Sequence, residues 1–498
     1  MSDAKSNNCL GGRRAGVMLH ITSLPGLGIN GDMGEESRHF VDFLVDSGFS
    51  YWQTLPAGPT RSDNSPYSTS SIHAGNPLLI DLNYLVQRYW LDASFLNKGV
   101  LTEKKRLQSL RMAWNVYTKL AGEHERAHMA EFTREQGYWL DDYALFRAIR
   151  KDQDCRAWWE WPAPLRDREP EAIAKVRARL AREIEYIGFE QFVFFQQWHE
   201  MKNYANRRGV KLFGDMPIFV AHDSAEVWVN RQYFLLDQNG APKVVAGVPP
   251  DYFSDTGQRW GNPLYDWDRL QEDGFTFWIQ RMKTQLAMFD LVRIDHFRGF
   301  ESCWEIPAED ETAIYGRWVS TPGQELFECL HKEYHSLPLV AEDLGLITPE
   351  VEALRDRFGL PGMKVLQFAF SGDHKNPHLP FKYPTNSVVY AGTHDNNTTI
   401  GWYESLDQDT RRYVDEFLGD SRLDMPWPML WKVLSSPSDL AILQMQDLLE
   451  LDGNHRMNTP GTTEGNWLWR FKWDQVDPGL AAKLRHRIAM YGRLAYDQ

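Results

Sequence analysis

The sequence has few cysteines and no long apolar run, and each absence excludes a class of protein. Four cysteines stand among 498 residues, with no CxxC pair and no spacing typical of a metal site. We therefore expect reduced thiols in a cytoplasmic protein without a bound metal. No run of about 18 apolar residues occurs, and the opening stretch "MSDAKSNNCLGGRRAG" has no apolar core of a signal peptide. Neither membrane spanning nor secretion is predicted.

Positive charge is also scarce. Lys and Arg number 54 against 68 Asp and Glu, which gives a net charge of −14. Nucleic acid and anionic membrane surfaces are therefore disfavoured as partners, because both are bound by clustered Lys and Arg. Tryptophan and tyrosine, at 20 residues each, are plentiful by contrast. Most of these must pack in the core, but such a composition also suits a substrate with apolar faces and many hydroxyls, such as a sugar chain.

Short apolar runs alternate with helical patterns along the chain, which is typical of βα units around a parallel sheet. The first unit comprises a strand in "GVMLHITSLPG", a helix in "EESRHFVDFLVDSG" that Gly48 is placed to end, and a strand in "FSYWQTLPAGP". Further strands are predicted in "VKLFGDMPIFV", "FDLVRIDHF", "LPLVAEDLG", "MKVLQFAF" and "SVVYAGTHDN". Strands of this composition are buried on both faces. The pattern predicts an α/β protein whose parallel strands form a barrel.

Two segments interrupt the strand series. Residues 85–190 are charged, amphipathic and strongly helix-forming, so we interpret them as a helical insertion into the barrel. Residues 231–263 are rich in Gly, Pro, Asp and aromatic residues, which predicts a long irregular loop that is functional. The first barrel elements then occupy 1–84 and the remainder of the barrel 191–498. The last stretch, "GLAAKLRHRIAMYGRLAYDQ", is helical in pattern, so no separate C-terminal β-domain is expected.

Polar residues stand at the C-terminal end of several predicted strands. In a barrel of parallel strands these ends meet on one face, where the active site lies. Asp295, Glu342 and Asp395 are separated by more than one βαβ unit of roughly 30 residues, so they belong to different strands and converge in space. An N-cap role would explain any one acid, but not the whole set. The residues in this position are Asp215, Arg293, Asp295, Glu342, Asp343, His394 and Asp395.

The surroundings of two of these acids differ. Alternation along a strand places Arg293 and Asp295 on the same side, where the guanidinium favours an ionised Asp295, as a nucleophile requires. Glu342 follows the apolar "LPLVA" with no Lys or Arg near it in sequence, and desolvation should raise its pKa and keep it protonated. A carboxylic acid beside a carboxylate is the arrangement that cleaves a glycosidic bond.

Together with other motifs, these residues resemble the amylomaltase (4-α-glucanotransferase, or disproportionating enzyme) family, glycoside hydrolase family 77 of the α-amylase clan. The resemblance runs from about Ser65 to Phe471 and covers nearly the whole chain. The matching motifs are "NSPYSTSS", "GDMPIFVAHDSAEVW", "GVPPDYFSDTGQRWGNP", "RIDHFRGF", "AEDLG", "GTHDNNTT" and "RMNTPGTTEGNWLWRF". The resemblance implies the family's fold, a (β/α)8 TIM barrel with inserted, largely helical subdomains and no separate C-terminal β-domain.

The resemblance implies Asp295 as the nucleophile, Glu342 as the acid/base and Asp395 as the stabiliser of the transition state. It also implies that Arg293, His394 and Asp215 hold the sugar in the cleavage subsite. Tyr67 is implied to stack against that sugar, Trp260 to cover the acceptor side, and Asn458 to contact the glucan. The implied substrate-binding residues are therefore Tyr67, Asp215, Trp260, Arg293, His394 and Asn458.

Structural alternatives remain open for some of these contacts. Tyr67 could be an ordinary packed tyrosine, Trp260 could only anchor its loop, and His394 could orient Asp395 without touching sugar. Tyr252 and Phe253 join Trp260 as expected acceptor-side aromatics. His296, His222 and Asp223 are interpreted as structural.

The implied reaction transfers a 1,4-α-glucan segment to the 4-hydroxyl of glucose or another glucan by a retaining double displacement. Its two carboxyl groups should lie about 5–5.5 Å apart. No metal or organic cofactor is expected. The expected partners are maltooligosaccharides and α-glucans as donor and acceptor, with glucose as acceptor, and the expected state is a monomer or weak homodimer.

Two other functions stay open. An α-glucan hydrolase of the same clan would use the same acids with water as the acceptor, so the strand-end residues alone do not separate hydrolysis from transfer. A glucan-binding protein without catalysis should have lost at least one of Asp295, Glu342 and Asp395, and all three are present.

Overall fold

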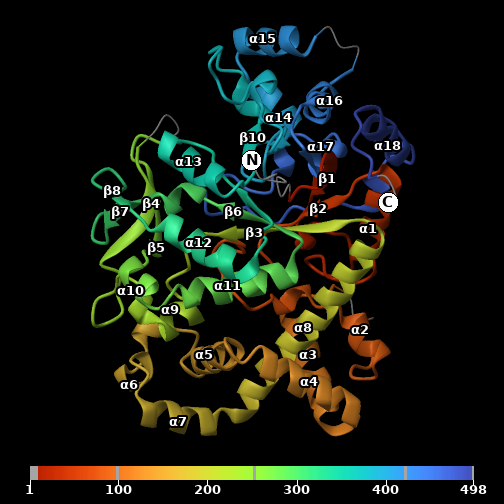
Figure 1. Ribbon diagram of the computed structural model, residues 1–498. Helices are drawn as coiled ribbons and strands as arrows, with labels where there is room; N and C mark the ends of the chain where they lie inside the picture. Colours follow the sequence, from red (N-terminus) through yellow and green to blue (C-terminus); the bar gives the residue numbers. More distant parts are fainter. Residues whose placement is uncertain (1–8, 97–99, 251–253, 420–422, 496–498) are drawn as a thin grey trace.

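The centre of the fold is an eight-stranded parallel sheet, ordered β10-β11-β12-β1-β2-β3-β6-β9 (Figure 1). The N–H of Ala341 in β9 donates a hydrogen bond of 2.8 Å to the carbonyl of Pro361, directly before β10. This bond joins the two ends of the sheet, so the predicted parallel barrel is confirmed. The strands are β1 (Arg14–Met18), β2 (Tyr51–Gln53), β3 (Lys211–Pro217), β6 (Leu291–Asp295), β9 (Leu339–Ala341), β10 (Gly362–Val365), β11 (Ser387–Tyr390) and β12 (Leu440–Gln444).

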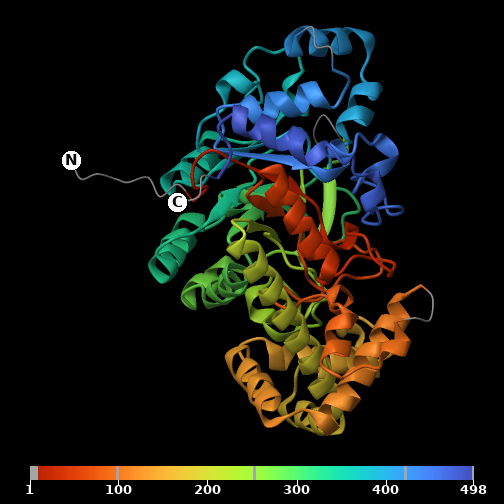
Figure 2. The ribbon, with the colours of Figure 1, turned by 90° about the vertical axis from the view of Figure 1, so that its right-hand side faces the viewer.

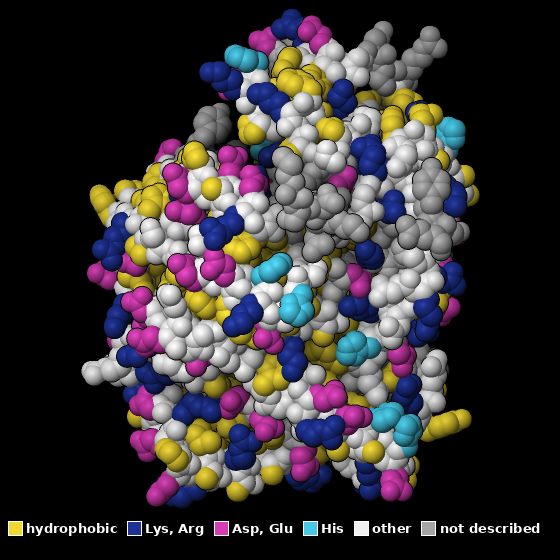
Figure 3. All heavy atoms as spheres, viewed as in Figure 1, with side chains coloured by type: hydrophobic (Ala, Val, Ile, Leu, Met, Phe, Trp, Pro, Cys, Tyr) yellow, Lys and Arg dark blue, Asp and Glu magenta, His cyan; other side chains and the backbone are white. Residues whose placement is uncertain are grey.

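The computed structural model describes residues 9–96, 100–250, 254–419 and 423–495. Within these ranges no helix is long and apolar enough to cross a membrane. Over the face that Figure 3 shows, basic side chains are interspersed with acidic ones, and apolar side chains lie between them. The described residues on this face therefore show no cluster of positive charge of the kind that nucleic acid binding requires.

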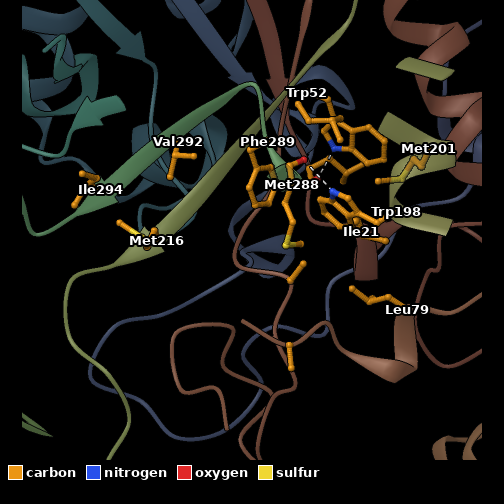
Figure 4. Packing of buried hydrophobic residues seen from close by; sticks show 14 of the residues in the cluster. Ile21, Trp52, Leu79, Trp198, Met201, Met216, Met288, Phe289, Val292 and Ile294 are labelled. Carbon is orange, nitrogen blue, oxygen red and sulfur yellow. Dashed lines mark hydrogen bonds between the residues drawn. The ribbon is translucent and has the colours of Figure 1, made fainter. Parts of the chain in front are cut away.

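Alternation along the strands divides the apolar side chains between the inside and the outside of the barrel. The inner core takes buried residues from all eight strands, among them Tyr51, Phe213 and Leu291. The outer core lies between the sheet and the helices and holds Val292 and Ile294 (Figure 4). Because Leu291 points inward and its neighbours outward, positions 293 and 295 also face the inside of the barrel. This register places the polar side chains of β6 inside the barrel, near its C-terminal end.

Helices occupy the connections between strands. Helix α1 follows β1 and ends before Gly48, which has a left-handed φ of 82° and donates its N–H back to the last turn, as predicted. Later connections contain α9 to α11 before β6, α12 before β9, α13 before β10 and α14 to α16 before β12, and α17 and α18 follow β12. Their bounds are α1 (Glu35–Ser47), α9 (Ala225–Val229), α10 (Trp267–Glu272), α11 (Thr276–Met288), α12 (Gly323–Tyr334), α13 (Pro349–Arg357), α14 (Thr399–Ser405), α15 (Gln408–Leu418), α16 (Trp427–Ser435), α17 (Met445–Leu448) and α18 (Leu480–Met490).

The connection from β2 to β3 is the long helical segment at the bottom of Figures 1 and 2. Its described residues contain no strand, so the predicted helical insertion into the barrel is confirmed. The last helix, α8, continues through residue 190 and packs against β3, with Trp198 Nε1 donating to the carbonyl of Met288 at 2.9 Å (Figure 4). The helices are α2 (Leu82–Gln87), α3 (Glu103–Leu120), α4 (Glu123–Glu135), α5 (Leu140–Asp152), α6 (Ala163–Arg166), α7 (Pro170–Arg179) and α8 (Ala181–Arg207).

A second, antiparallel sheet corrects the interpretation of residues 231–263 as an irregular loop. Two strands of that segment pair with two strands that follow β6, in the order β5-β4-β7-β8. Frequent Gly and Pro conceal the two short strands, which pair with each other, and β7, the second partner of β4, lies far along the chain. The four strands are β4 (Val244–Val248), β5 (Gln258–Pro263), β7 (Ser302–Pro307) and β8 (Arg317–Ser320).

The eighth barrel strand was also missed by the sequence reading. Strand β12 is the short apolar run "LAILQ", which leads directly into the helical residues of α17. A run of this length cannot be told from a buried helix by periodicity alone. Its parallel pairing with β1, which opens the chain, is what identifies it as a barrel strand.

Candidate active site

Arg293 holds two acidic side chains at the end of neighbouring strands. It is 4% exposed, and its Nη2 lies 2.7 Å from Oδ1 of Asp295, two residues further along β6. Its Nη1 donates to both carboxylate oxygens of Asp215 at 2.8 Å, and Asp215 is its direct partner in β3. The predicted contact between Arg293 and Asp295 is therefore confirmed. The second carboxylate fixes the guanidinium in place.

Glu342 follows β9 and faces the same region. Its Oε2 accepts a hydrogen bond of 2.7 Å from the N–H of His296, and its Oε1 accepts one of 2.9 Å from the N–H of Leu344. Desolvation raises the pKa of Glu342 to about 7, against the opposing effect of Arg293, while the charge of Asp295 adds to the rise. The raised pKa that the sequence predicts, and its cause, are confirmed.

The backbone beside Asp295 is shaped for this contact. His296 adopts a left-handed conformation with a φ of 55°, which is uncommon for a residue other than glycine. The turn directs the N–H of His296 at Glu342, so β6 and β9 are joined where their acids emerge. Strained backbone at such a place is typical of a functional site.

Asp395 lies in the loop after β11 and is held from the segment that follows β12. Asn458 Nδ2 donates to its Oδ1 at 2.6 Å, and Arg456 Nη2 donates to its carbonyl at 2.8 Å. His394 Nε2 lies 3.3 Å from its Oδ2. The side chain of Asp395 is 46% exposed, so it keeps a free face toward solvent.

Tyr67 connects these groups. Its hydroxyl donates to Oδ2 of Asp215 at 2.8 Å and lies 2.8 Å from Nε2 of His394. Because the hydroxyl proton is used by the carboxylate, we infer that His394 Nε2 donates to Tyr67. The two rings are stacked, with centroids 5.3 Å apart and planes inclined at 15°.

A cleft of about 550 Å³ opens over these residues. Its lining combines carboxylates, amides and hydroxyls with aromatic rings, which is the chemistry that recognises sugars. The lining includes six of the predicted site residues, Tyr67, Trp260, Asp295, Glu342, Asp395 and Asn458. It also includes His222 and His296, which the sequence alone assigns to a structural role.

Three predicted substrate contacts lie behind this lining. Asp215, Arg293 and His394 are 1%, 4% and 4% exposed and are not among the residues that line the cleft. They form a buried layer that supports Tyr67 and Asp295. The structure thus brings all nine predicted site residues together, in two layers.

Trp260 stands on β5 and lines the cleft. It is 39% exposed and meets the ring of His296 edge-on, with centroids 4.8 Å apart and planes at 88°. Its exposure leaves an aromatic face available to a ligand. The other two expected acceptor-side aromatics, Tyr252 and Phe253, lie outside the described residues.

Sequence reasoning missed several residues of the cleft. Trp467 lines it, has a φ of 66° and lies 5.9 Å from Tyr67 between ring centroids. Phe219, at the loop after β3, lines the Trp260 side. Both stand inside motifs that the sequence analysis quoted, "GTTEGNWLWRF" and "GDMPIFVAHDSAEVW", so the motifs were the available signal. Arg456 acts through the backbone of Asp395, for which no sequence pattern exists.

A cleft at the C-terminal end of a parallel barrel, with carboxyl groups from separate strands and aromatic walls, defines a class: an enzyme that acts on glycosidic bonds. The profile of one protein family, described as 4-alpha-glucanotransferase of glycoside hydrolase family 77, matches residues 19–476. This chain belongs to that family, and its activity is 4-α-glucanotransfer. The family and the class of enzyme predicted from the sequence are confirmed.

Individual relatives support the assignment over the full length. The chain is 47% identical to a 4-alpha-glucanotransferase of Thermus thermophilus, over 95% of this chain and 97% of the relative. It is 46% identical to one of Synechocystis sp., over 97% and 99% of the two chains. Among solved structures, the amylomaltase of Streptococcus agalactiae in complex with acarbose is 37% identical and superposes with a TM-score of 0.94, covering 97% of this chain and all of the other.

Proposed function

We propose that the chain transfers a 1,4-α-glucan segment to the 4-hydroxyl of glucose or another glucan by a retaining double displacement. Asp295 attacks the anomeric carbon while Glu342 protonates the leaving oxygen, which gives a covalent β-glycosyl-enzyme. Glu342 then takes the proton of the acceptor hydroxyl as the acceptor displaces Asp295. Two inversions retain the α-linkage, and Asp395 stabilises the positive charge that develops on the sugar.

The observation that carries this proposal is the contrast between two neighbouring carboxyl groups. Asp295 is in contact with the guanidinium of Arg293, at 2.7 Å. Glu342 is desolvated and has a pKa raised to about 7, so a substantial fraction of it carries a proton near neutral pH. Two carboxyl groups in such different surroundings take the roles of nucleophile and general acid.

Disproportionation of maltotriose tests the proposed function. The purified chain should convert maltotriose alone into glucose plus a ladder of longer maltooligosaccharides, resolved by chromatography. Glucose and maltose without longer products would identify the α-glucan hydrolase instead. Unchanged maltotriose would favour the glucan-binding protein without catalysis.

The pH dependence of the first step follows from the protonated acid. Because Glu342 must carry its proton, kcat/KM for maltotriose should fall as the pH rises above about 7, the pKa to which desolvation raises this group. An α-glucosyl fluoride needs no proton on its leaving group, so its first step should lack this fall. If kcat/KM falls equally at high pH with both donors, ionisation of Glu342 is not the cause of the fall.

Trp260 should decide between transfer and hydrolysis. Its exposed ring lines the cleft, and we propose that it stacks on the acceptor sugar and displaces water from the glycosyl-enzyme. Trp260→Ala should then raise the ratio of reducing-sugar release to transfer. It should also raise the KM for acceptor glucose about fivefold, as expected for loss of one aromatic contact.

A tryptophan of the same small sheet provides the control for Trp260. Trp318, on β8, packs edge-on against Trp304 at 5.2 Å between centroids and does not line the cleft. Trp318→Ala should lower thermal stability and leave the ratio of hydrolysis to transfer as in the wild type. If Trp260→Ala behaves in the same way, the residue only anchors its strand.

A further inference from the structure

His222 lines the same cleft as Trp260. The loop after β3 that carries His222 runs beside the strand that carries Trp260. Asn262 Nδ2 donates to the carbonyl of Val220 at 3.1 Å, and the rings of Phe219 and Trp260 lie 6.3 Å apart. His222 therefore belongs to the same wall as Trp260, on the proposed acceptor side.

Contacts with the helical insertion hold His222 in this place. The ring of Trp159 is stacked on the imidazole, with centroids 4.0 Å apart and planes inclined at 8°. Trp158 Nε1 donates to the carbonyl of His222 at 2.7 Å. Arg150, on α5, forms an ion pair of 2.7 Å with Asp223, which is 1% exposed. Three separate contacts thus fix two consecutive residues of the cleft wall.

The imidazole has one defined tautomer. His222 Nε2 lies 2.7 Å from the carbonyl of Gly240, and a carbonyl only accepts, so Nε2 carries the proton. Burial lowers the pKa of His222, so the ring is neutral and Nδ1 is an acceptor. Nδ1 makes none of the hydrogen bonds found between described residues of the chain. His222 thus brings an unused acceptor and a rigid ring to the wall of the cleft.

Stacking of a histidine on a tryptophan does not by itself identify a binding site. His39 and Trp473 are stacked at 3.9 Å between α1 and the C-terminal segment, and neither lines the cleft. That pair joins α1 to the C-terminal segment away from the cleft. The pair of His222 and Trp159 differs because one member lines a cleft that is open to solvent.

We propose that His222, supported by Trp159, forms a distal sugar-binding platform on the acceptor side, so that the helical insertion sets the preference for acceptor length. The imidazole presents a flat face for the apolar side of a glucose ring, and Nδ1 accepts a hydrogen bond from a sugar hydroxyl. A maltooligosaccharide reaches further along the cleft than glucose does, so it is the acceptor that we expect to contact the platform. This inference rests on the proposed transferase function.

Acceptor kinetics test the platform. With one fixed donor glucan, KM is measured for glucose and for maltopentaose as acceptors, in the wild type, Trp159→Leu and His222→Ala. We expect the ratio of the maltopentaose KM to the glucose KM to rise about fivefold in both variants, which is the effect of losing one aromatic contact. Trp473→Leu, which breaks the remote stack, is the matched control and should leave the ratio unchanged.

The outcomes separate this inference from the proposed function. A wild-type chain that transfers to no acceptor contradicts the proposed function itself. A wild-type chain that transfers normally, with an unchanged KM ratio in both variants, overturns only the platform. Thermal unfolding is followed in parallel. An equal change of both KM values with a lower melting temperature assigns Trp159 to packing and also overturns the inference.

Discussion

Asp295→Asn is expected to abolish both transfer and hydrolysis, with kcat/KM for maltotriose lowered by roughly 10⁴-fold or more, the scale of losing a nucleophile. The amide cannot form the covalent intermediate through which both reactions pass. The fold should survive, because Asp295 is partly exposed and its partner Arg293 keeps both bonds to Asp215. Initial rates and thermal unfolding of the variant measure the two effects.

The control for this variant stands at the other end of the same strand. Asp290 precedes β6, and its Oδ2 accepts hydrogen bonds of 2.8 Å from the N–H of Leu212 and the side chain of Asn206. Asp290→Asn should cost some stability and leave transfer close to the wild-type rate. Activity of Asp295→Asn within about tenfold of wild type would exclude Asp295 as the nucleophile.

Glu342→Gln should slow turnover of maltotriose by roughly 10²–10⁴-fold, the usual contribution of a general acid. A glutamine oxygen can still accept from the N–H of His296 or Leu344, so the turn between β6 and β9 should persist. The first step with an α-glucosyl fluoride should be nearly unaffected, since fluoride leaves without a proton. Steady-state rates with maltotriose and the rate of fluoride release provide the comparison.

Two results would argue against this role for Glu342. Normal disproportionation of maltotriose by Glu342→Gln would show that another group protonates the leaving oxygen. Equal losses with maltotriose and with the fluoride would point to a damaged site, not to a missing proton. Unfolding temperature close to that of the wild type should accompany the expected pattern, because the side chains have nearly the same shape.

The sequence predicts the strand ends of this site because side-chain alternation and barrel geometry are local and regular. Arg293 and Asp295 are two residues apart on one strand, so their contact required no knowledge of the fold. Glu342 follows an apolar run, and that alone predicted a desolvated carboxyl. The convergence of Asp395 with them needed only the rule that parallel strands end on one face.

Features that depend on partners far along the chain could not be predicted in this way. Strands β4 and β5 are short; they pair with each other, and β4 also pairs with β7, which lies far along the chain. The bond from Arg456 to the carbonyl of Asp395 joins loops after different barrel strands. The stacking of Trp159 on His222 joins the helical insertion to the cleft wall. Tertiary contacts of this kind leave no periodicity in the sequence.

The most direct test of the double displacement is to trap and locate its intermediate. Glu342→Gln is incubated with an α-maltosyl fluoride, denatured and digested, and the peptides are analysed by mass spectrometry. We expect a maltosyl unit attached to the peptide that contains Asp295, at near-stoichiometric occupancy, and no label in the double variant with Asp295→Asn. Complete release of fluoride with no labelled peptide, or a label on another residue, would contradict a covalent mechanism through Asp295.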